Sequence, residues 1–150
     1  MSLQSAALAY RISKTQEIEV LLVTSRRGAR WRIPRVKVKC GRSARSCANQ
    51  DAFQEAGVFG KIAQDPLVRW FRKPATFRTD LPDKVIEAYA LAVETEAPCW
   101  PDMHRRQRSW MSLKDAISVV KGKRWKRMLR LLGQSNPANK ALKYVNGETT

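Results

Sequence analysis

The chain has 150 residues, and 43% of them are hydrophobic, which is typical of one folded domain and excludes an intrinsically disordered chain. Lysine and arginine total 29 against 13 aspartate and glutamate, so the formal net charge at pH 7 is +16. A charge of this size favours a polyanionic partner, which from composition alone is a nucleic acid, a membrane surface or a phosphate-rich small molecule. No apolar run is long enough to cross a membrane, and residues 1–10 carry no basic leader, so we expect neither a membrane span nor a secretory signal.

The cysteines indicate the redox environment. Cys40, Cys47 and Cys99 are odd in number and irregularly spaced, and His104 is the one histidine of the sequence. A disulfide framework needs pairs, and a structural zinc site usually has two cysteines close together, so neither is expected. We expect reduced thiols and a cytoplasmic protein.

Several apolar or alternating segments, bounded by turn residues, are predicted to be strands. In chain order they are residues 5–12, 17–24, 31–33, 58–62, 67–71, 84–95 and 108–111. Residues 26–30, which contain Gly28, are predicted to form a loop, and Pro34 is predicted to end the short strand before it.

Two regions follow a helical period. Residues 44–56 carry an alanine at every fourth position and end at Gly57, which predicts a helix whose small side chains lie against a sheet. Ser112 and Asp115 resemble a capping box that opens a second helix, which Gly122 interrupts before residues 123–132 continue it. Together these elements predict an α/β (α+β) sandwich around a mixed β-sheet, with one domain over residues 1–133 and a polar tail over residues 134–150.

The end of the first predicted helix carries a recognisable motif. Gln54, Glu55, Ala56, Gly57 and Val58 close the helix in a way that resembles the Nudix box, whose pattern ends in two glutamates, any residue, glycine and an apolar residue. Glu55 keeps the second glutamate, whereas Gln54 replaces the first. The resemblance implies the Nudix α/β/α sandwich.

The earlier positions of the box depart further from the family. Its Arg-Glu step has become Gln50-Asp51, its first glutamate is Arg42, and its opening glycine is Val36. Outside the box, SAALAYRI, EIEVLLVTSRR and WRIP, followed by the Trp100-Pro101 region, resemble the diphosphoinositol-polyphosphate phosphohydrolase branch over roughly residues 5–133.

The resemblance implies cleavage of a diphosphate linkage by water with the help of Mg²⁺ or Mn²⁺. Asp51 and Glu55 lie one helical turn apart and are the candidate metal ligands, and Gln54 joins them as a catalytic candidate. Arg42 places a cation where the family keeps an acid, which opposes a divalent metal. We therefore expect reduced or absent hydrolase activity. If the protein is active, its cofactor is Mg²⁺ or Mn²⁺; if it is inactive, we expect no cofactor. The structural alternative is that Asp51 and Glu55 are two solvated acids on a helix face.

Residues 26–45 contain nine basic residues and no acidic one. Arginine grips phosphate with a planar fork of donors, so this segment is predicted to bind a phosphate-rich ligand. The candidate ligand-binding residues are Arg26, Arg27, Arg30, Arg35, Lys37, Lys39 and Arg42. Two further basic clusters occupy residues 104–108 and 121–130, and a solvated surface that aids solubility is the alternative for each.

These observations predict a Nudix-type protein that binds a polyphosphorylated small molecule, such as a diphosphoinositol polyphosphate or a nucleoside diphosphate linked to another group. One alternative is an active hydrolase with an atypical metal site. A second alternative is a nucleic-acid-binding module on the same fold, although the sequence has no RNP-like, zinc-finger or helix-turn-helix signature. No membrane partner is expected, and the sequence is silent on the oligomeric state.

Overall fold

The structure is a computed structural model that describes residues 2–72 and 84–135. The elements, in chain order, are β1 (Ser2–Ile12), β2 (Ile18–Thr24), β3 (Trp31–Arg32), β4 (Arg35–Lys37), α1 (Ala44–Ala56), β5 (Val58–Ile62), β6 (Val68–Arg72), β7 (Lys84–Glu96), β8 (Arg108–Ser112), α2 (Leu113–Val119) and α3 (Lys123–Gln134). None of the described helices is long and apolar enough to cross a membrane.

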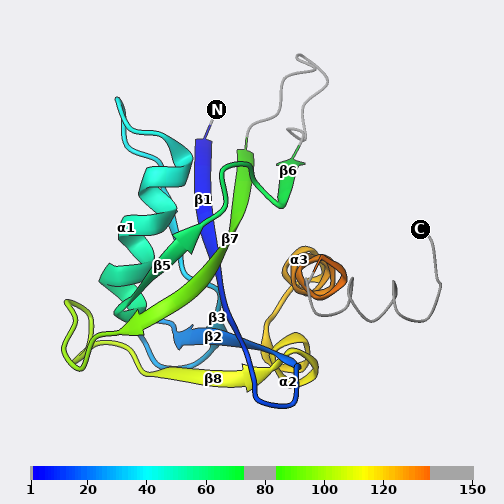
Figure 1. Cartoon of the computed structure of the whole chain (residues 1–150). Helices are drawn as coiled ribbons and strands as arrows, with labels where there is room; N and C mark the ends of the chain where they lie inside the picture. The colour runs from blue at the N-terminus through cyan, green and yellow to red at the C-terminus, as the bar shows by residue number, and fades with distance from the viewer. Residues whose placement is uncertain (1, 73–83, 136–150) are drawn as a thin grey trace.

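The strands form one mixed sheet in which the central pair, β1 and β7, run parallel and lie side by side (Figure 1). The remaining described pairs are antiparallel. Because β1 and β7 are long, each serves different partners along its length: β4 and then β2 pair with β1, and β6 and then β5 pair with β7. The predicted mixed sheet is confirmed.

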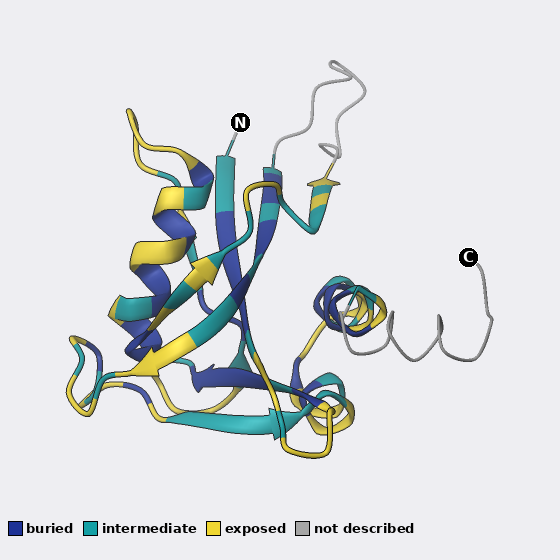
Figure 2. Cartoon of the chain, in the orientation of Figure 1, coloured by how far each residue is buried: buried dark blue, intermediate teal, exposed yellow. Residues whose placement is uncertain are grey.

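Helices cover both faces of this sheet (Figure 1). Successive residues of β1 point to opposite faces, so Ala6 and Leu8 pack in the core beneath α2 and α3, while Ala7 and Ala9 pack in the core beneath α1. Figure 2 shows the inward sides of α1 and α3 as buried and their outward sides as exposed. The predicted α/β/α sandwich is therefore confirmed.

The predicted helix over residues 44–56 is α1, with the same bounds. Its four alanines are 8%, 0%, 0% and 0% exposed in chain order and pack against the sheet. The Ser43 side chain accepts a hydrogen bond from the Ser46 backbone N–H and caps the start of the helix. Gly57 ends the helix with φ of +66°, a left-handed conformation that glycine adopts without strain.

The C-terminal helices also follow their predicted pattern. Ser112 accepts a hydrogen bond from the Asp115 backbone N–H at the start of α2, and Gly122 separates α2 from α3. The apolar face of α3 is buried in the core rather than exposed. Residues 136–150, which make up most of the predicted tail, lie outside the described residues.

One strand was not predicted. The segment Arg35–Lys37 forms β4 and pairs with the N-terminal half of β1, which begins at Ser2 and not at residue 5. Val36 and Val38 do alternate with basic residues, but the strand has only 3 residues, and its pairing partner lies about 30 residues away, so the local pattern was too short to predict it. The three cysteines form no disulfide, which agrees with the expectation of free thiols.

The alanine stripe generates a stability prediction. Ala52 is fully buried between α1 and the sheet, so Ala52→Leu should lower the free energy of unfolding by about 1–3 kcal/mol through overpacking. Asn49→Leu, on the exposed side of the same helix, should change it by about 0.5 kcal/mol or less. Urea unfolding followed by tryptophan fluorescence measures both, and equal stabilities would contradict the close packing of α1.

Candidate functional site

One side of α1 that does not face the sheet lines a pocket of about 690 Å³. The helical residues in its wall are Cys47, Gln50, Asp51, Gln54 and Glu55, whose spacing places them along one face of the helix. Strands β3 and β4, the basic segment after β4, and the segment containing Asp102 and Arg106 complete the wall. The predicted motif residues and most of the predicted basic residues therefore meet in one cavity.

The Glu55 carboxylate is bound by several groups of the pocket wall. Its side chain is 3% exposed, and its Oε1 accepts a hydrogen bond of 2.7 Å from Arg32 Nη2 and lies 3.4 Å from Arg106 Nη2. Its Oε2 accepts a hydrogen bond of 3.2 Å from the Arg35 backbone N–H. A buried carboxylate needs such compensation, and here two guanidinium groups and one amide supply it.

A second acid continues this network. Asp102 accepts a 2.9 Å hydrogen bond from Arg106 Nε through Oδ2 and a 2.9 Å hydrogen bond from Gln54 Nε2 through Oδ1. Burial raises the pKa of Asp102, but the hydrogen bonds from Arg106 and Gln54 outweigh this effect and hold the pKa below its usual value. Gln54 thus orients Asp102, which in turn holds the arginine that faces Glu55.

Asp51 behaves differently from the other two acids. It is 9% exposed, and its Oδ2 has no hydrogen-bond partner among the described residues. Burial raises the pKa of Asp51 to about 9, and the neighbouring Glu55 carboxylate adds to the increase. The Asp51 side chain therefore holds its proton more tightly than an exposed aspartate does.

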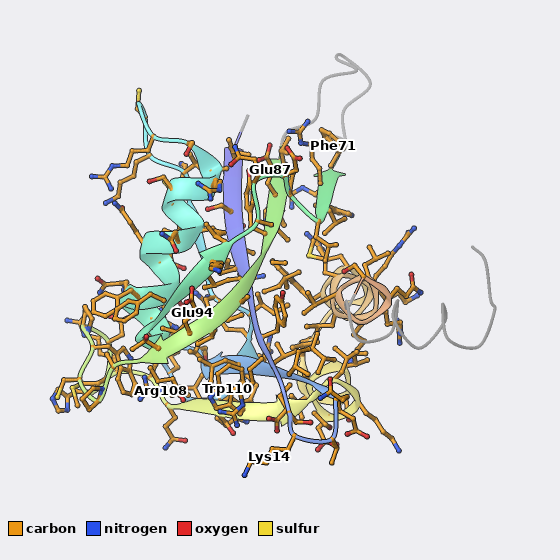
Figure 3. All side chains as sticks on the ribbon, in the orientation of Figure 1. Lys14, Phe71, Glu87, Glu94, Arg108 and Trp110 are labelled. Carbon is orange, nitrogen blue, oxygen red and sulfur yellow. The ribbon has the colours of Figure 1, made fainter. Side chains whose placement is uncertain are left out.

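The end of α1 that carries Glu55 is fixed from outside the pocket. Trp100 Nε1 donates a 3.0 Å hydrogen bond to the Glu55 carbonyl, and Arg108 Nη1 donates one of 2.9 Å to the Ala56 carbonyl. The Arg108 guanidinium lies 3.9 Å from the centre of the Trp100 ring, at the C-terminal end of α1 (Figure 3). A Cβ added to Gly57 would lie 2.8 Å from Trp100 Cβ, so the close approach of Trp100 also requires glycine. These contacts satisfy carbonyls that a helix end leaves unpaired.

The predicted ligand-binding residues fall into distinct places. Arg26, Lys37, Lys39 and Arg42 line the pocket, and Arg42 Nη1 donates a hydrogen bond to Gln50 Oε1. Arg27 lines a second, neighbouring hollow, and Arg30 lines neither.

Arg35 also lines the pocket; its backbone N–H binds Glu55, and its guanidinium lies 4.6 Å from the centre of the Trp125 ring in α3. Sequence reasoning did not select Arg32, Arg106 or Asp102 as site residues. The sequence did contain a signal for the pair Asp102 and Arg106. Asp102 is the one acid between Glu96 and Asp115, and it lies four residues before Arg106.

The donor set fits a Mg²⁺ or Mn²⁺ site poorly. The described residues contain no cluster of three or more histidine, cysteine, aspartate or glutamate side chains that could hold a metal ion. Of the two predicted ligands, Glu55 already contacts two arginines, and Asp51 holds its proton more tightly than an exposed aspartate does. A divalent ion would compete with the two guanidinium groups for Glu55 and with the proton for Asp51.

Comparison with known proteins gives sequence relatives but no matching family model. Nudix hydrolase 4 of Arabidopsis thaliana is 31% identical over 108 residues, which cover 71% of this chain and 49% of the relative. Nudix hydrolase 18, mitochondrial, of the same plant is 27% identical over 123 residues, which cover 80% of this chain and 66% of the relative. The chain thus spans about half to two thirds of the length of these curated relatives.

Solved structures share the fold. An Ap4A hydrolase of C. elegans, in a binary complex, aligns with a TM-score of 0.65 and 19% identity over 89% of this chain and 96% of that chain. The NUDIX domain of Shewanella oneidensis NrtR, complexed with ADP ribose, aligns with a TM-score of 0.66 and 16% identity over 88% of this chain and 86% of that domain. The solved structures show that the chain has the Nudix fold, and the 31% identity to Nudix hydrolase 4 over 71% of the chain shows that it belongs to the Nudix hydrolase superfamily.

Proposed function

We propose that the chain binds a polyphosphorylated small molecule in the pocket beside α1 and that its metal-dependent hydrolase activity is reduced or lost. The observation that carries this proposal is the charge of the pocket wall. Seven lysine or arginine residues line it against three acids, and two of those acids are already paired with arginines. Arg26, Lys37 and Lys39 are exposed and have no acidic partner among the described residues, so their charges are available to a ligand.

The pocket chemistry suits phosphate groups. Apart from Val36 and Cys47, the lining side chains are charged or polar, and they offer N–H donors and positive charge rather than an apolar surface. Solved structures of the same fold include an Ap4A hydrolase and a domain complexed with ADP ribose, and those ligands also carry linked phosphates. The resemblance to the diphosphoinositol-polyphosphate branch supports a diphosphoinositol polyphosphate or a nucleoside diphosphate derivative as the ligand class for this chain.

The first test removes two free charges from the pocket. Lys37→Ala combined with Lys39→Ala should weaken the affinity for inositol hexakisphosphate about tenfold, as expected for two screened ion pairs of about 0.7 kcal/mol each. Arg127→Ala combined with Arg130→Ala removes the same charge from the exposed side of α3 and should change the affinity less than about twofold. Calorimetry at low and physiological salt measures both, and an equal loss in the two variants would reject a specific pocket.

An active hydrolase with an atypical metal site is the second candidate function. It is favoured by Asp51 Oδ2, which is buried, unpartnered among the described residues and one helical turn from Glu55. A carboxylate oxygen in that position could serve as a metal ligand if the proton left.

Metal binding in the pocket can be tested with two variants that carry the same change in charge. Arg32→Gln combined with Arg42→Glu frees Glu55 from one guanidinium and makes the pocket three charges more negative, without placing a carboxylate beside Asp102 as Gln54→Glu would. Each charge a few ångströms away contributes about 1 kcal/mol even when screened, so Mn²⁺ should bind at least about tenfold more tightly than to the native protein.

Arg130→Gln combined with Arg127→Glu makes the same charge change on α3 and should leave Mn²⁺ binding unaltered. Calorimetric titration with Mn²⁺ and a phosphate-release assay are run on all three proteins. Tight Mn²⁺ binding by the native protein, together with efficient phosphate release, would favour the active hydrolase instead.

A further inference from the structure

A second hollow of about 520 Å³ lies next to the first pocket. It is formed by the end of β2, the loop after β2 and residues 103–107, which precede β8. Its basic residues are Arg26, Arg27, His104, Arg105 and Arg106, and none of its lining residues is acidic. No specific function was predicted from the sequence for the basic cluster at residues 104–108.

Hydrogen bonds hold the two sides of this second hollow together. The Thr24 N–H donates to the Gln107 carbonyl at 3.0 Å, the Gln107 N–H donates to Thr24 Oγ1 at 2.9 Å, and Arg106 Nη1 donates to the Thr24 carbonyl at 3.0 Å. The loop after β2 is closed by a 2.8 Å hydrogen bond from the Ser25 N–H to the Arg30 carbonyl. Gly28 adopts φ of +71° inside this loop. These hydrogen bonds hold the backbone on both sides of the hollow in place.

The two pockets share two arginines in their walls. Arg26 and Arg106 line both of them. Arg106 is 7% exposed and already paired with Asp102 and Glu55, so its charge is largely compensated within the protein. Arg26, Arg27 and Arg105 are exposed and have no acidic partner among the described residues. Positive charge that is free to act on a ligand therefore extends from the first pocket into the second.

We propose that the second hollow is a further anion-binding subsite and that the protein binds a linear phosphate chain extended along both pockets. This inference rests on the proposed function of the first pocket. A ligand that reaches both subsites makes its second contact intramolecularly, so its affinity exceeds that of a ligand confined to one pocket. Among the residues that line the two hollows, His104 is the one aromatic side chain, and this wall matches a chain of phosphates better than a nucleic acid, whose bases stack on aromatic side chains.

The experiment compares phosphate chains of two lengths. Tripolyphosphate and a linear polyphosphate of about ten phosphates are titrated into the native protein and into Arg27→Ala combined with Arg105→Ala. The variant should lose about tenfold in affinity for the long chain and less than about twofold for tripolyphosphate, because only the long chain reaches the second hollow. Arg127→Ala combined with Arg130→Ala removes equal charge elsewhere and should preserve both affinities.

An equal loss for the short and the long chain in the second-pocket variant, or no loss for either, would overturn the inference. Displacement of the long polyphosphate by single-stranded RNA of the same phosphate number, at equal concentration, would overturn the assignment to a plain phosphate chain. Lys37→Ala combined with Lys39→Ala separates the two proposals. If this variant binds tripolyphosphate as well as the native protein does, the proposed function of the first pocket fails, and the inference that rests on it fails for that separate reason.

Discussion

The buried carboxylate of Glu55 joins three parts of the chain that are distant in sequence. It lies near the end of α1, receives a hydrogen bond from Arg32 in β3 and one from the Arg35 backbone in β4, and faces Arg106 in the segment before β8. A buried anion is costly unless its neighbours compensate it, and the two guanidinium groups would repel each other without it. The shape of the first pocket therefore depends on this one charge and the groups that neutralise it.

The same interactions change what the helix face can do chemically. Glu55 is engaged by arginines, and burial beside Glu55 raises the pKa of Asp51, so both candidate metal ligands have other partners to lose before they could bind a divalent ion. Gln54 donates its amide to Asp102 and so belongs to the supporting network. The positive charge of the pocket wall comes from segments outside the helix, Arg42 among them, since the α1 residues that line the pocket include no lysine or arginine.

Local signals made much of the fold predictable from the sequence. The alanine period and Gly57 fixed both ends of α1, because helix packing and helix termination depend on residues close together in the chain. Strand β4 was not predicted, because it pairs with the distant N-terminal half of β1. The contacts of the basic segment were equally hidden, because the Trp125 ring that the Arg35 guanidinium meets comes from α3, far along the chain.

Net charge alone could not identify the binding surface, because part of it serves the fold. Four arginines lie over tryptophan rings at 3.9–4.6 Å from the ring centres; the pairs are Arg11 with Trp110, Arg35 with Trp125, Arg108 with Trp100 and Arg124 with Trp70. Such contacts stabilise the cation without an acid, so they can lessen the self-repulsion of a chain with a net charge of +16. Arg32 and Arg106 serve the fold in another way, through Glu55 and Asp102. The charges left for a ligand are those without an acidic partner among the described residues, and in the two pockets these belong to the loop after β2, the segment around Lys37 and Lys39, and the segment before β8.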